Sequence, residues 1–175
     1  MKKIALFFLI LMITVQYGCN KNNSQNNMSD TGKNSVTGIE IGNKIPDFVF
    51  YDLNMNKIES SNYAGKPLIL NFWATWCPPC REEMPSIESF YGQAKEKGIE
   101  IAAISVDDSL STVSEFLKTN SYSFPIYFDN GGVLSRTFLI RSIPTTYIIN
   151  KEGIIIDKKI GGFDWTTIDT SEILK

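Results

Sequence analysis

A continuous apolar run over residues 68–73 predicts a strand that is buried on both faces of a sheet. The next segment, residues 79–97, predicts an amphipathic helix that ends at Gly98. A second apolar run over residues 99–106 predicts the following strand. Strand, helix and strand in this order predict a right-handed crossover between parallel strands, at whose carboxyl ends functional residues gather. The apolar residues at helical spacing are Met84, Ile87, Tyr91 and Ala94.

The remaining elements are predicted from shorter patterns on either side of this unit. Two apolar stretches around a polar break predict an N-terminal hairpin over residues 47–60, which covers one edge of the sheet. Asp107, Asp108 and Ser109 can cap a helix that runs to Thr119. Farther along, we expect a strand at 126–128, a short helix at 131–138, an antiparallel hairpin within 147–160 and a closing helix from Asp164 to Leu174.

The length of the chain and its first residues predict one exported domain. With 175 residues, of which 43% are hydrophobic, the chain has material for one core. Lys2 and Lys3 precede an uncharged run over residues 4–15, which is the pattern of a secretory signal. This run is too short to span a bilayer comfortably as a helix of the mature protein. We therefore expect an extracytoplasmic location.

Cys19 follows Gly18 at the end of this run, which is similar to a bacterial lipoprotein signal, although Gln16 stands where that pattern usually has Leu. An ordinary signal peptide that is cut elsewhere is the alternative. With lipidation at Cys19, the protein would be held at a membrane surface by a polar linker. The expected organisation is a signal peptide at 1–18, a lipidated, disordered tether at 19–40 and a folded domain at 41–175.

Composition narrows the chemistry that the chain can perform. Its 17 basic and 19 acidic side chains give a net charge of −2 and form no basic patch for a nucleic acid. The absence of histidine removes the commonest general base and the commonest transition-metal ligand. A structural zinc site needs four ligands, and away from the leader only Cys77 and Cys80 are cysteines. We expect no metal and no cofactor other than a redox-active cysteine pair.

Cys77 and Cys80 stand where the first buried strand gives way to the helix, with Pro78 and Pro79 between them. Two cysteines three residues apart on a first helical turn are within disulfide reach. The partial positive charge at the helix N-terminus favours the thiolate, which is the reactive form. We therefore predict a dithiol redox site, with Cys77 as the nucleophile and Cys80, one turn deeper, as the resolving thiol.

The order of these elements resembles the thioredoxin superfamily, and within it the TlpA/ResA-like extracytoplasmic thiol-disulfide oxidoreductases. The resemblance spans residues 41–175 and rests on two separated motifs, at residues 71–85 and 143–146. It implies an α/β thioredoxin-like fold, with a central mixed sheet flanked by helices and an N-terminal β-hairpin. Residues 107–130 look like the central insertion of this subfamily.

The resemblance also implies roles for residues around the cysteines. Pro144 is expected in the cis form, against the common trans form, and the backbone of Ile143 is expected to pair with the bound polypeptide. Asn71 replaces the buried acid of thioredoxin itself, and Glu83 matches a functional Glu of the ResA-like members. If buried, Glu83 can exchange protons with Cys80; a solvated surface charge is the alternative. The other expected site-shaping residues are Trp76, Pro78 and Pro79.

We expect a reductant of disulfides in exported proteins, because few backbone N–H groups stabilise the Cys77 thiolate. The family implies apocytochrome c as a frequent substrate and a membrane thiol electron donor of CcdA/DsbD type. An alternative role is electron donor to an extracytoplasmic methionine sulfoxide reductase. A thiol peroxidase is disfavoured because Leu70 and Ala74 replace the Pro and Thr of its motif. A non-catalytic interaction module with a structural disulfide is the last alternative.

Overall fold

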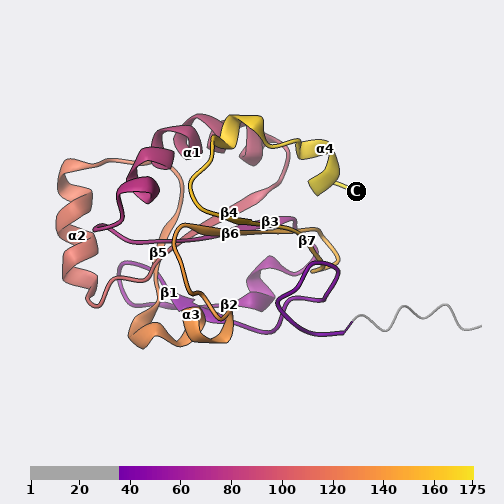
Figure 1. The fold of residues 1–175 in the computed structure, drawn as a ribbon, viewed down its shortest axis with the longest axis horizontal. Coiled ribbons are helices and arrows are strands. Elements are labelled where there is room, and N and C mark those ends of the chain that lie inside the picture. The colour runs from indigo at the N-terminus through magenta and orange to yellow at the C-terminus, as the bar shows by residue number, and fades with distance from the viewer. Residues whose placement is uncertain (1–35) are drawn as a thin grey trace, which may run out of the picture. The chain divides into compact units, whose positions relative to one another are not determined.

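The computed structural model of the protein describes residues 36–175 (Figure 1). The predicted signal peptide and the predicted lipidation at Cys19 lie outside the described residues. Residues 36–40, which were predicted to belong to the tether, pack with the folded domain through hydrogen bonds to residues 43 and 44. The amide of Gly38 donates to the carbonyl of Lys44, and the amide of Lys44 donates to the carbonyl of Val36, both at 2.9 Å. The folded domain therefore begins before residue 41.

Seven strands form one mixed sheet in the order β2-β1-β5-β4-β3-β6-β7. The central strands β3, β4 and β5 are parallel, and β6 pairs antiparallel with β3. The β1–β2 hairpin adds to β5 at one edge, and β7 forms the other edge beside β6. This arrangement confirms the predicted thioredoxin-like fold, including the edge position of the N-terminal hairpin. The strands are β1 Val49–Tyr51, β2 Lys57–Glu59, β3 Leu68–Trp73, β4 Glu100–Ser105, β5 Ile126–Phe128, β6 Thr145–Ile149 and β7 Ile155–Ile160.

Helices cover both faces of the sheet. Figure 1 shows α1 and α4 on one side of the sheet and α3 on the other. The α-helices are α1 Pro78–Glu96, α2 Leu110–Thr119, α3 Val133–Thr137 and α4 Thr170–Ile173, and the short 3₁₀ helices are η1 Ser60–Tyr63, η2 Asn130–Gly132 and η3 Trp165–Thr167. Among residues 36–175, no helix has both the length and the apolar character needed to cross a membrane.

Strand β3 divides the core into two halves, because alternate residues of a strand point to opposite faces. All six of its residues are buried, as the apolar run predicted. Ile69 and Trp73 pack beneath α1, whereas Leu70 and Phe72 pack on the α3 side. The polar side chain of Asn71 points to the α1 side, where it contacts Glu83. A strand that is enclosed in this way holds the start of α1 on a rigid support.

Two predicted caps differ from those of the structure. The segment from Asp164 to Leu174 is not one helix. Asp164 caps η3 through the amide of Thr166, and Asp169 then caps α4 through the amide of Ser171, so the chain starts a second helix after an extended break. At the start of α2, Ser109 alone supplies the side-chain cap. Asp107, which was predicted to share in this cap, turns instead toward the loop before α1.

Candidate active site

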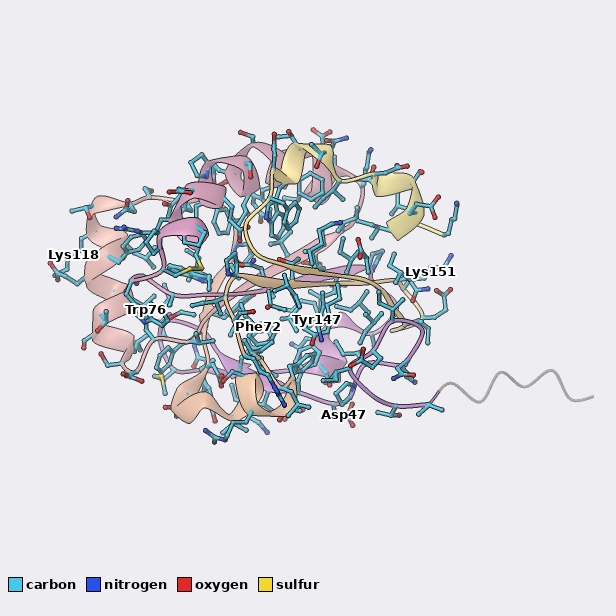
Figure 2. The ribbon with its side chains drawn as sticks, in the orientation of Figure 1. Asp47, Phe72, Trp76, Lys118, Tyr147 and Lys151 are labelled. Carbon is cyan, nitrogen blue, oxygen red and sulfur yellow. A yellow bond between two sulfur atoms is a disulfide. The ribbon has the colours of Figure 1, made fainter. Side chains whose placement is uncertain are left out.

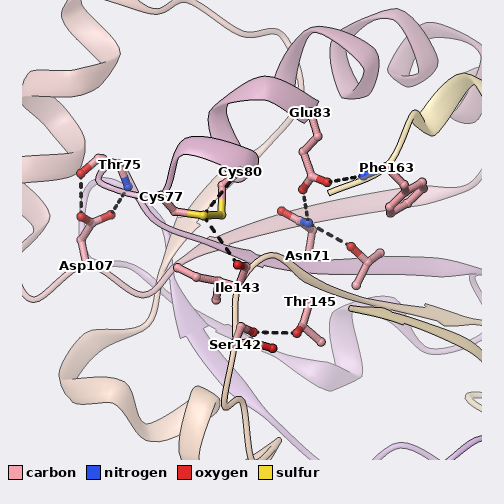
Figure 3. The surroundings of a disulfide bond; sticks show 11 residues. Asn71, Thr75, Cys77, Cys80, Glu83, Asp107, Ser142, Ile143, Thr145 and Phe163 are labelled. Carbon is pink, nitrogen blue, oxygen red and sulfur yellow. Dashed lines mark hydrogen bonds between the residues drawn. A yellow bond between two sulfur atoms is a disulfide. The ribbon is translucent and has the colours of Figure 1, made fainter. Parts of the chain in front are cut away.

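Cys77 and Cys80 lie at the start of α1, directly behind the end of β3 (Figure 3). Cys77 is the N-cap residue with an extended backbone, and Pro78 is the first helical residue. Proline is favoured there because it lacks the amide hydrogen that would have no helical partner. The two sulfurs form a disulfide with Cα atoms 5.3 Å apart. Cys77 is 3% exposed and Cys80 is fully buried, so Cys77 is the member of the pair with any exposed surface. Its neighbour Trp76, which is labelled in Figure 2, is 65% exposed.

Few hydrogen-bond donors face the outer sulfur. The backbone amide of Cys80 donates to Sγ of Cys77 at 3.3 Å. Pro78 and Pro79 have no amide hydrogen to offer. In the reduced protein, a Cys77 thiolate would therefore be stabilised by this donor and by the positive end of α1, which is 19 residues long.

The loop before β6 lies against the disulfide. The Ile143–Pro144 peptide bond is cis, and the carbonyl oxygen of Ile143 is 3.7 Å from Sγ of Cys77. The amide of Gly161 donates to the carbonyl of Pro144 at 2.8 Å, which ties the end of β7 to this loop. Two segments that are distant in sequence, at Cys77 and at Ile143, thus form one surface.

Glu83 is buried one turn behind Cys80 on α1, with 4% of its surface exposed. Its Oε1 accepts a hydrogen bond from Asn71 Nδ2 at 2.9 Å, and its Oε2 accepts one from the amide of Phe163 at 3.4 Å. Burial raises the pKa of Glu83 to about 7, because removal from water disfavours the charged form, and the Asn71 side chain, the amide of Phe163 and the Trp165 side chain only partly offset this effect. A carboxyl with this pKa can gain or lose a proton near neutral pH.

Asn71 joins Glu83 to the sheet. Its Nδ2 donates to Glu83 and also to Oγ1 of Thr146 on β6, at 3.0 Å. Its Oδ1 is buried and has no hydrogen-bond partner among residues 36–175. An unpaired buried acceptor is uncommon in folded proteins. Here it lies on the side chain that contacts the titratable Glu83.

Asp107, a predicted cap of the helix that follows it, is a second buried carboxylate near the cysteines. It follows β4, and its oxygens accept hydrogen bonds from the amide of Thr75 at 3.0 Å, from Oγ1 of Thr75 at 2.7 Å and from Oγ of Ser105 at 2.7 Å. Thr75 directly precedes Trp76 and Cys77. Asp107 therefore fixes the loop that presents the outer cysteine. The available signal was its position just after a buried strand, beside the strand that leads to the cysteines.

A hollow of about 440 Å³ lies between the start of α1 and the chain after β7. Glu83, Pro79 and Gly162 are among the residues that line it. A Cβ atom at position 162 would lie 3.1 Å from the carbonyl oxygen of Pro79, so glycine allows a close approach to the cysteine-bearing turn. The hollow lies against the buried Glu83 and against the turn that carries the cysteines.

The described domain brings most of the predicted site residues together, and Cys19 lies outside the described residues. Pro144 is buried beside the disulfide, whereas Trp76 stands outward at the rim. Residues 36–175 contain no group of three or more His, Cys, Asp or Glu side chains placed to hold a metal ion. The residues gathered at the start of α1 are Asn71, Trp76, Cys77, Pro78, Pro79, Cys80, Glu83, Ile143 and Pro144.

A thioredoxin-type sheet with a disulfide at the start of its first long helix defines a class of redox proteins, and comparison with known proteins gives the same result. Residues 41–158 match the AhpC/TSA family, so the chain belongs to that family. Thiol-disulfide oxidoreductase ResA of Bacillus thuringiensis is 41% identical to it over 120 residues, which is 69% of each chain. This similarity confirms the predicted relationship to ResA-like proteins.

Solved structures agree with this assignment. StoA from Bacillus subtilis superimposes with a TM-score of 0.61 at 30% identity, over 69% of this chain and 92% of StoA. A thiol:disulfide interchange protein from Chlorobium tepidum superimposes with a TM-score of 0.62 at 28% identity, over 70% of this chain and 88% of that protein.

The two residues at which this chain differs from the peroxidase motif are part of the hydrophobic core. Leu70 and Ala74 stand where that motif has Pro and Thr, seven and three positions before the outer cysteine. Both side chains are fully buried in the core. A buried leucine and a buried alanine offer no hydroxyl group near Cys77. At these two positions the chain therefore lacks the side chains of the peroxidase motif.

Proposed function

We propose that this protein is an extracytoplasmic thiol-disulfide oxidoreductase that reduces disulfide bonds in exported proteins. One observation carries the proposal: the Cys77–Cys80 pair lies at a helix start, with one sulfur near the surface and the backbone of Ile143 beside it. The free backbone of such a loop can pair with an extended polypeptide that brings its disulfide to Cys77. The names of the ResA relatives support the same class of reaction.

The reaction begins with the reduced pair. The Cys77 thiolate attacks one sulfur of the substrate disulfide, a mixed disulfide forms and the other substrate sulfur leaves as a thiolate. The Cys80 thiolate then attacks Sγ of Cys77 and releases the second substrate sulfur. Two electrons have passed to the substrate, and the enzyme holds the Cys77–Cys80 disulfide. A dithiol donor must reduce this disulfide before the next cycle.

Glu83 is the group that we assign to proton transfer for Cys80. Cys80 must lose its proton before it attacks, and a buried carboxylate with a pKa of about 7 can accept that proton. The amide of Asn71 can serve both charge states of Glu83. In the present orientation it donates to the carboxylate, and after a flip its Oδ1 could accept from the protonated acid and from the hydroxyl of Thr146.

The direction of electron flow follows from the surroundings of Cys77. One backbone amide contacts its sulfur, and a thiolate with few donors is only moderately stabilised. A less stabilised reduced form favours a stronger reductant. The proposed donor is a membrane thiol protein of CcdA/DsbD type, the proposed anchor is a lipid on Cys19, and apocytochrome c in cytochrome maturation is the proposed substrate.

The reduction potential tests this function. The purified protein is equilibrated with dithiothreitol and glutathione buffers, and the fluorescence of the tryptophans next to the site is followed. We expect a single two-electron transition below about −220 mV. A value near −120 mV would make the protein an oxidase. The absence of any transition would leave a structural disulfide.

Trapping identifies the chemistry of each cysteine. Cys80→Ser should accumulate a mixed disulfide with a disulfide-bonded substrate, because no thiol resolves it. Cys77→Ser should form none and should lose all reductase activity. Non-reducing gels and mass spectrometry distinguish the two variants. Equal trapping by both variants would contradict the assigned order of attack.

A further inference from the structure

Trp165 lies in the chain after β7, and its side chain is fully buried against α1. Its ring meets the ring of Phe90 on α1 edge to face, with centroids 6.1 Å apart. It also stacks on Phe163, with centroids 5.5 Å apart and planes at 9°. Two aromatic neighbours therefore fix the position of the indole.

Hydrogen bonds tie the same segment to Glu83. The amide of Trp165 donates to Oγ of Ser86 at 3.1 Å, and the hydroxyl of Ser86 donates to the carbonyl of Glu83 at 2.7 Å. The amide of Phe163 donates to Oε2 of Glu83 at 3.4 Å (Figure 3). The residues around Trp165 are thus bound to both the backbone and the carboxyl group of Glu83.

The indole N–H of Trp165 is a buried donor without a hydrogen-bond partner among residues 36–175. Such a group is unfavourable, because an indole N–H can only donate. The side chain of Trp165 nevertheless lowers the pKa of Glu83, against the larger effect of burial. The N–H therefore lies near the carboxyl group and favours its charged form, without the distance and angle of a full hydrogen bond.

Asn71 brings an unpaired atom of the opposite kind to the same carboxyl group. Its Nδ2 donates to Oε1 of Glu83 at 2.9 Å, and its Oδ1 is a buried acceptor with no partner in the described domain. An ionised carboxyl group only accepts hydrogen bonds, whereas a protonated one also donates. The unpaired donor of Trp165 matches the ionised form of Glu83, and the unpaired acceptor of Asn71 matches the protonated form.

We propose that Trp165 is a positioning residue for proton transfer from Cys80, and that its indole N–H donates to the ionised carboxyl group of Glu83. The inference rests on the proposed function, because it concerns the step in which Cys80 resolves the mixed disulfide. In this step the S–H bond of Cys80 breaks and an O–H bond forms on Glu83. The sulfur keeps the electron pair with which it attacks Sγ of Cys77. Trp165 acts through Glu83, by setting how readily the carboxyl group ionises.

Other titratable groups lie around Glu83, and substitution of Trp165 leaves all of them in place. They are Cys80 and Glu82 on α1, Asp164 in the segment that carries Trp165, and Lys159 on β7, whose Nζ lies 5.5 Å from the ring centroid of Phe163. Glu82 and Asp164 are exposed, so water and salt screen their charges. Strands β3 and β6 contribute the neutral side chains of Asn71 and Thr146. A change in the pKa of Glu83 in a Trp165 variant therefore reports the loss of the indole.

Trp165→Phe removes the indole N–H and keeps an aromatic ring. Trp73→Phe is the matched control, because Trp73 is also fully buried with an unpaired Nε1 in this part of the chain, but packs against Phe116 on α2. Infrared difference spectra follow the titration of Glu83 in the oxidised full chain, and Glu83→Gln assigns its signal. We expect the midpoint to rise by about one pH unit in Trp165→Phe, because the charged form loses a donor. Trp73→Phe should keep the wild-type midpoint.

The rate of resolution gives a second readout. The small disulfide dithiobis-nitrobenzoate releases one coloured thiolate when Cys77 attacks it and a second when Cys80 resolves the mixed disulfide. Trp165→Phe should slow the second release about fivefold at pH 7, because a carboxyl group with a pKa near 8 is about one-tenth ionised there instead of half. At about pH 9 the variant should match the wild type. A slowing that is equal at both pH values would show a merely structural role for Trp165.

A measurement on the wild type does not require the variant to fold. In nitrogen-15-labelled protein, the indole N–H resonance of Trp165 should move with pH at the midpoint of Glu83 and stay fixed in Glu83→Gln. The resonance of Trp73 should move in neither protein. A resonance of Trp165 that does not follow Glu83, or an unchanged midpoint in Trp165→Phe, would overturn the role of Trp165. A wild type that shows no second release of thiolate would instead overturn the proposed dithiol reaction, and the indole titration would still decide on Trp165.

Discussion

Two buried carboxylates lie near the disulfide, and their surroundings differ in the number of hydrogen bonds that they receive. Asp107 and Glu83 are equally hidden, at 4% exposure each. Asp107 accepts three hydrogen bonds, from the amide and hydroxyl of Thr75 and from the hydroxyl of Ser105. Glu83 accepts two, and one of them is long, at 3.4 Å. The two carboxyl groups are therefore equally buried, but Asp107 accepts more hydrogen bonds than Glu83.

This difference separates a structural role from a chemical one. A buried acidic side chain that accepts several hydrogen bonds fixes the groups that donate to it. Asp107 in this way holds the loop before Cys77. A buried carboxyl with fewer donors has a raised pKa, and the pKa of Glu83 is about 7. Glu83 can therefore change its charge while the pair turns over, whereas Asp107 keeps the loop in place.

The largest effect is expected from Asp107→Ala. Removal of this carboxylate leaves one buried donor, on Ser105, and two partly buried donors, on Thr75, without their acceptor, and we expect the free energy of unfolding to fall by about 4 kcal/mol. Urea unfolding of the oxidised protein measures the change. Asp108→Ala, at the exposed neighbouring residue, is the control and should change little. If the two variants are equally stable, Asp107 does not fix the loop. Asp107→Asn should retain part of the stability because one oxygen still accepts.

Glu83→Gln tests whether Glu83 changes its charge near neutral pH, through the pH dependence of the free energy of unfolding. The folded pKa of about 7 is above the ordinary value of 4.5, so the folded state holds the proton more tightly than the unfolded state. The stabilisation that the raised pKa of Glu83 gives the folded state is complete below pH 4.5. As the pH rises to about 7, about 3 kcal/mol of it is lost. Gln cannot titrate, so the variant should lack this loss. Urea unfolding at several pH values measures it.

Glu82→Gln is the matched control, because Glu82 precedes Glu83 on α1 and is exposed. It should keep the wild-type dependence of stability on pH. The same three proteins can be compared in the resolution step, where Glu83→Gln alone should lose the rate dependence near pH 7. A wild type whose stability does not fall between pH 4.5 and 7 would show that Glu83 is not perturbed.

The sequence predicted those parts of the fold that depend on local pattern. The apolar run became β3, buried at all six positions, and Lys97 with Gly98 ended α1 as expected. The closing helix was predicted as one element because Asp164 is a good cap. Asp169 is an equally good cap five residues later, and it starts a new helix. Composition alone does not decide between two competing caps.

In the candidate site, too, the features that depend on local pattern could be predicted and the long-range contacts could not. Cys77 and Cys80 could be predicted because their spacing and their place between strand and helix are local features. The partners of Asp107 and Glu83 could not, because Thr75 lies 32 positions from Asp107 and Phe163 lies 80 positions from Glu83. Such contacts exist only after β3 and β4 pair and the chain after β7 returns to α1. For this reason, the sequence alone did not show whether Glu83 is buried or exposed.

The smallest predicted effect, from Thr75→Val, tests whether the number of donors is what separates the two carboxylates. Valine keeps the shape of threonine and the backbone amide but removes the hydroxyl that donates to Asp107 at 2.7 Å. Asp107 would then accept two bonds, as Glu83 does. We expect a loss of about 1 kcal/mol in the free energy of unfolding, the usual contribution of one such hydrogen bond. Thr75→Ser restores the hydroxyl and should recover most of this loss. If serine and valine behave alike, the methyl contacts of Thr75 matter more than its hydroxyl, and the amide of Thr75 with Ser105 is sufficient to hold Asp107.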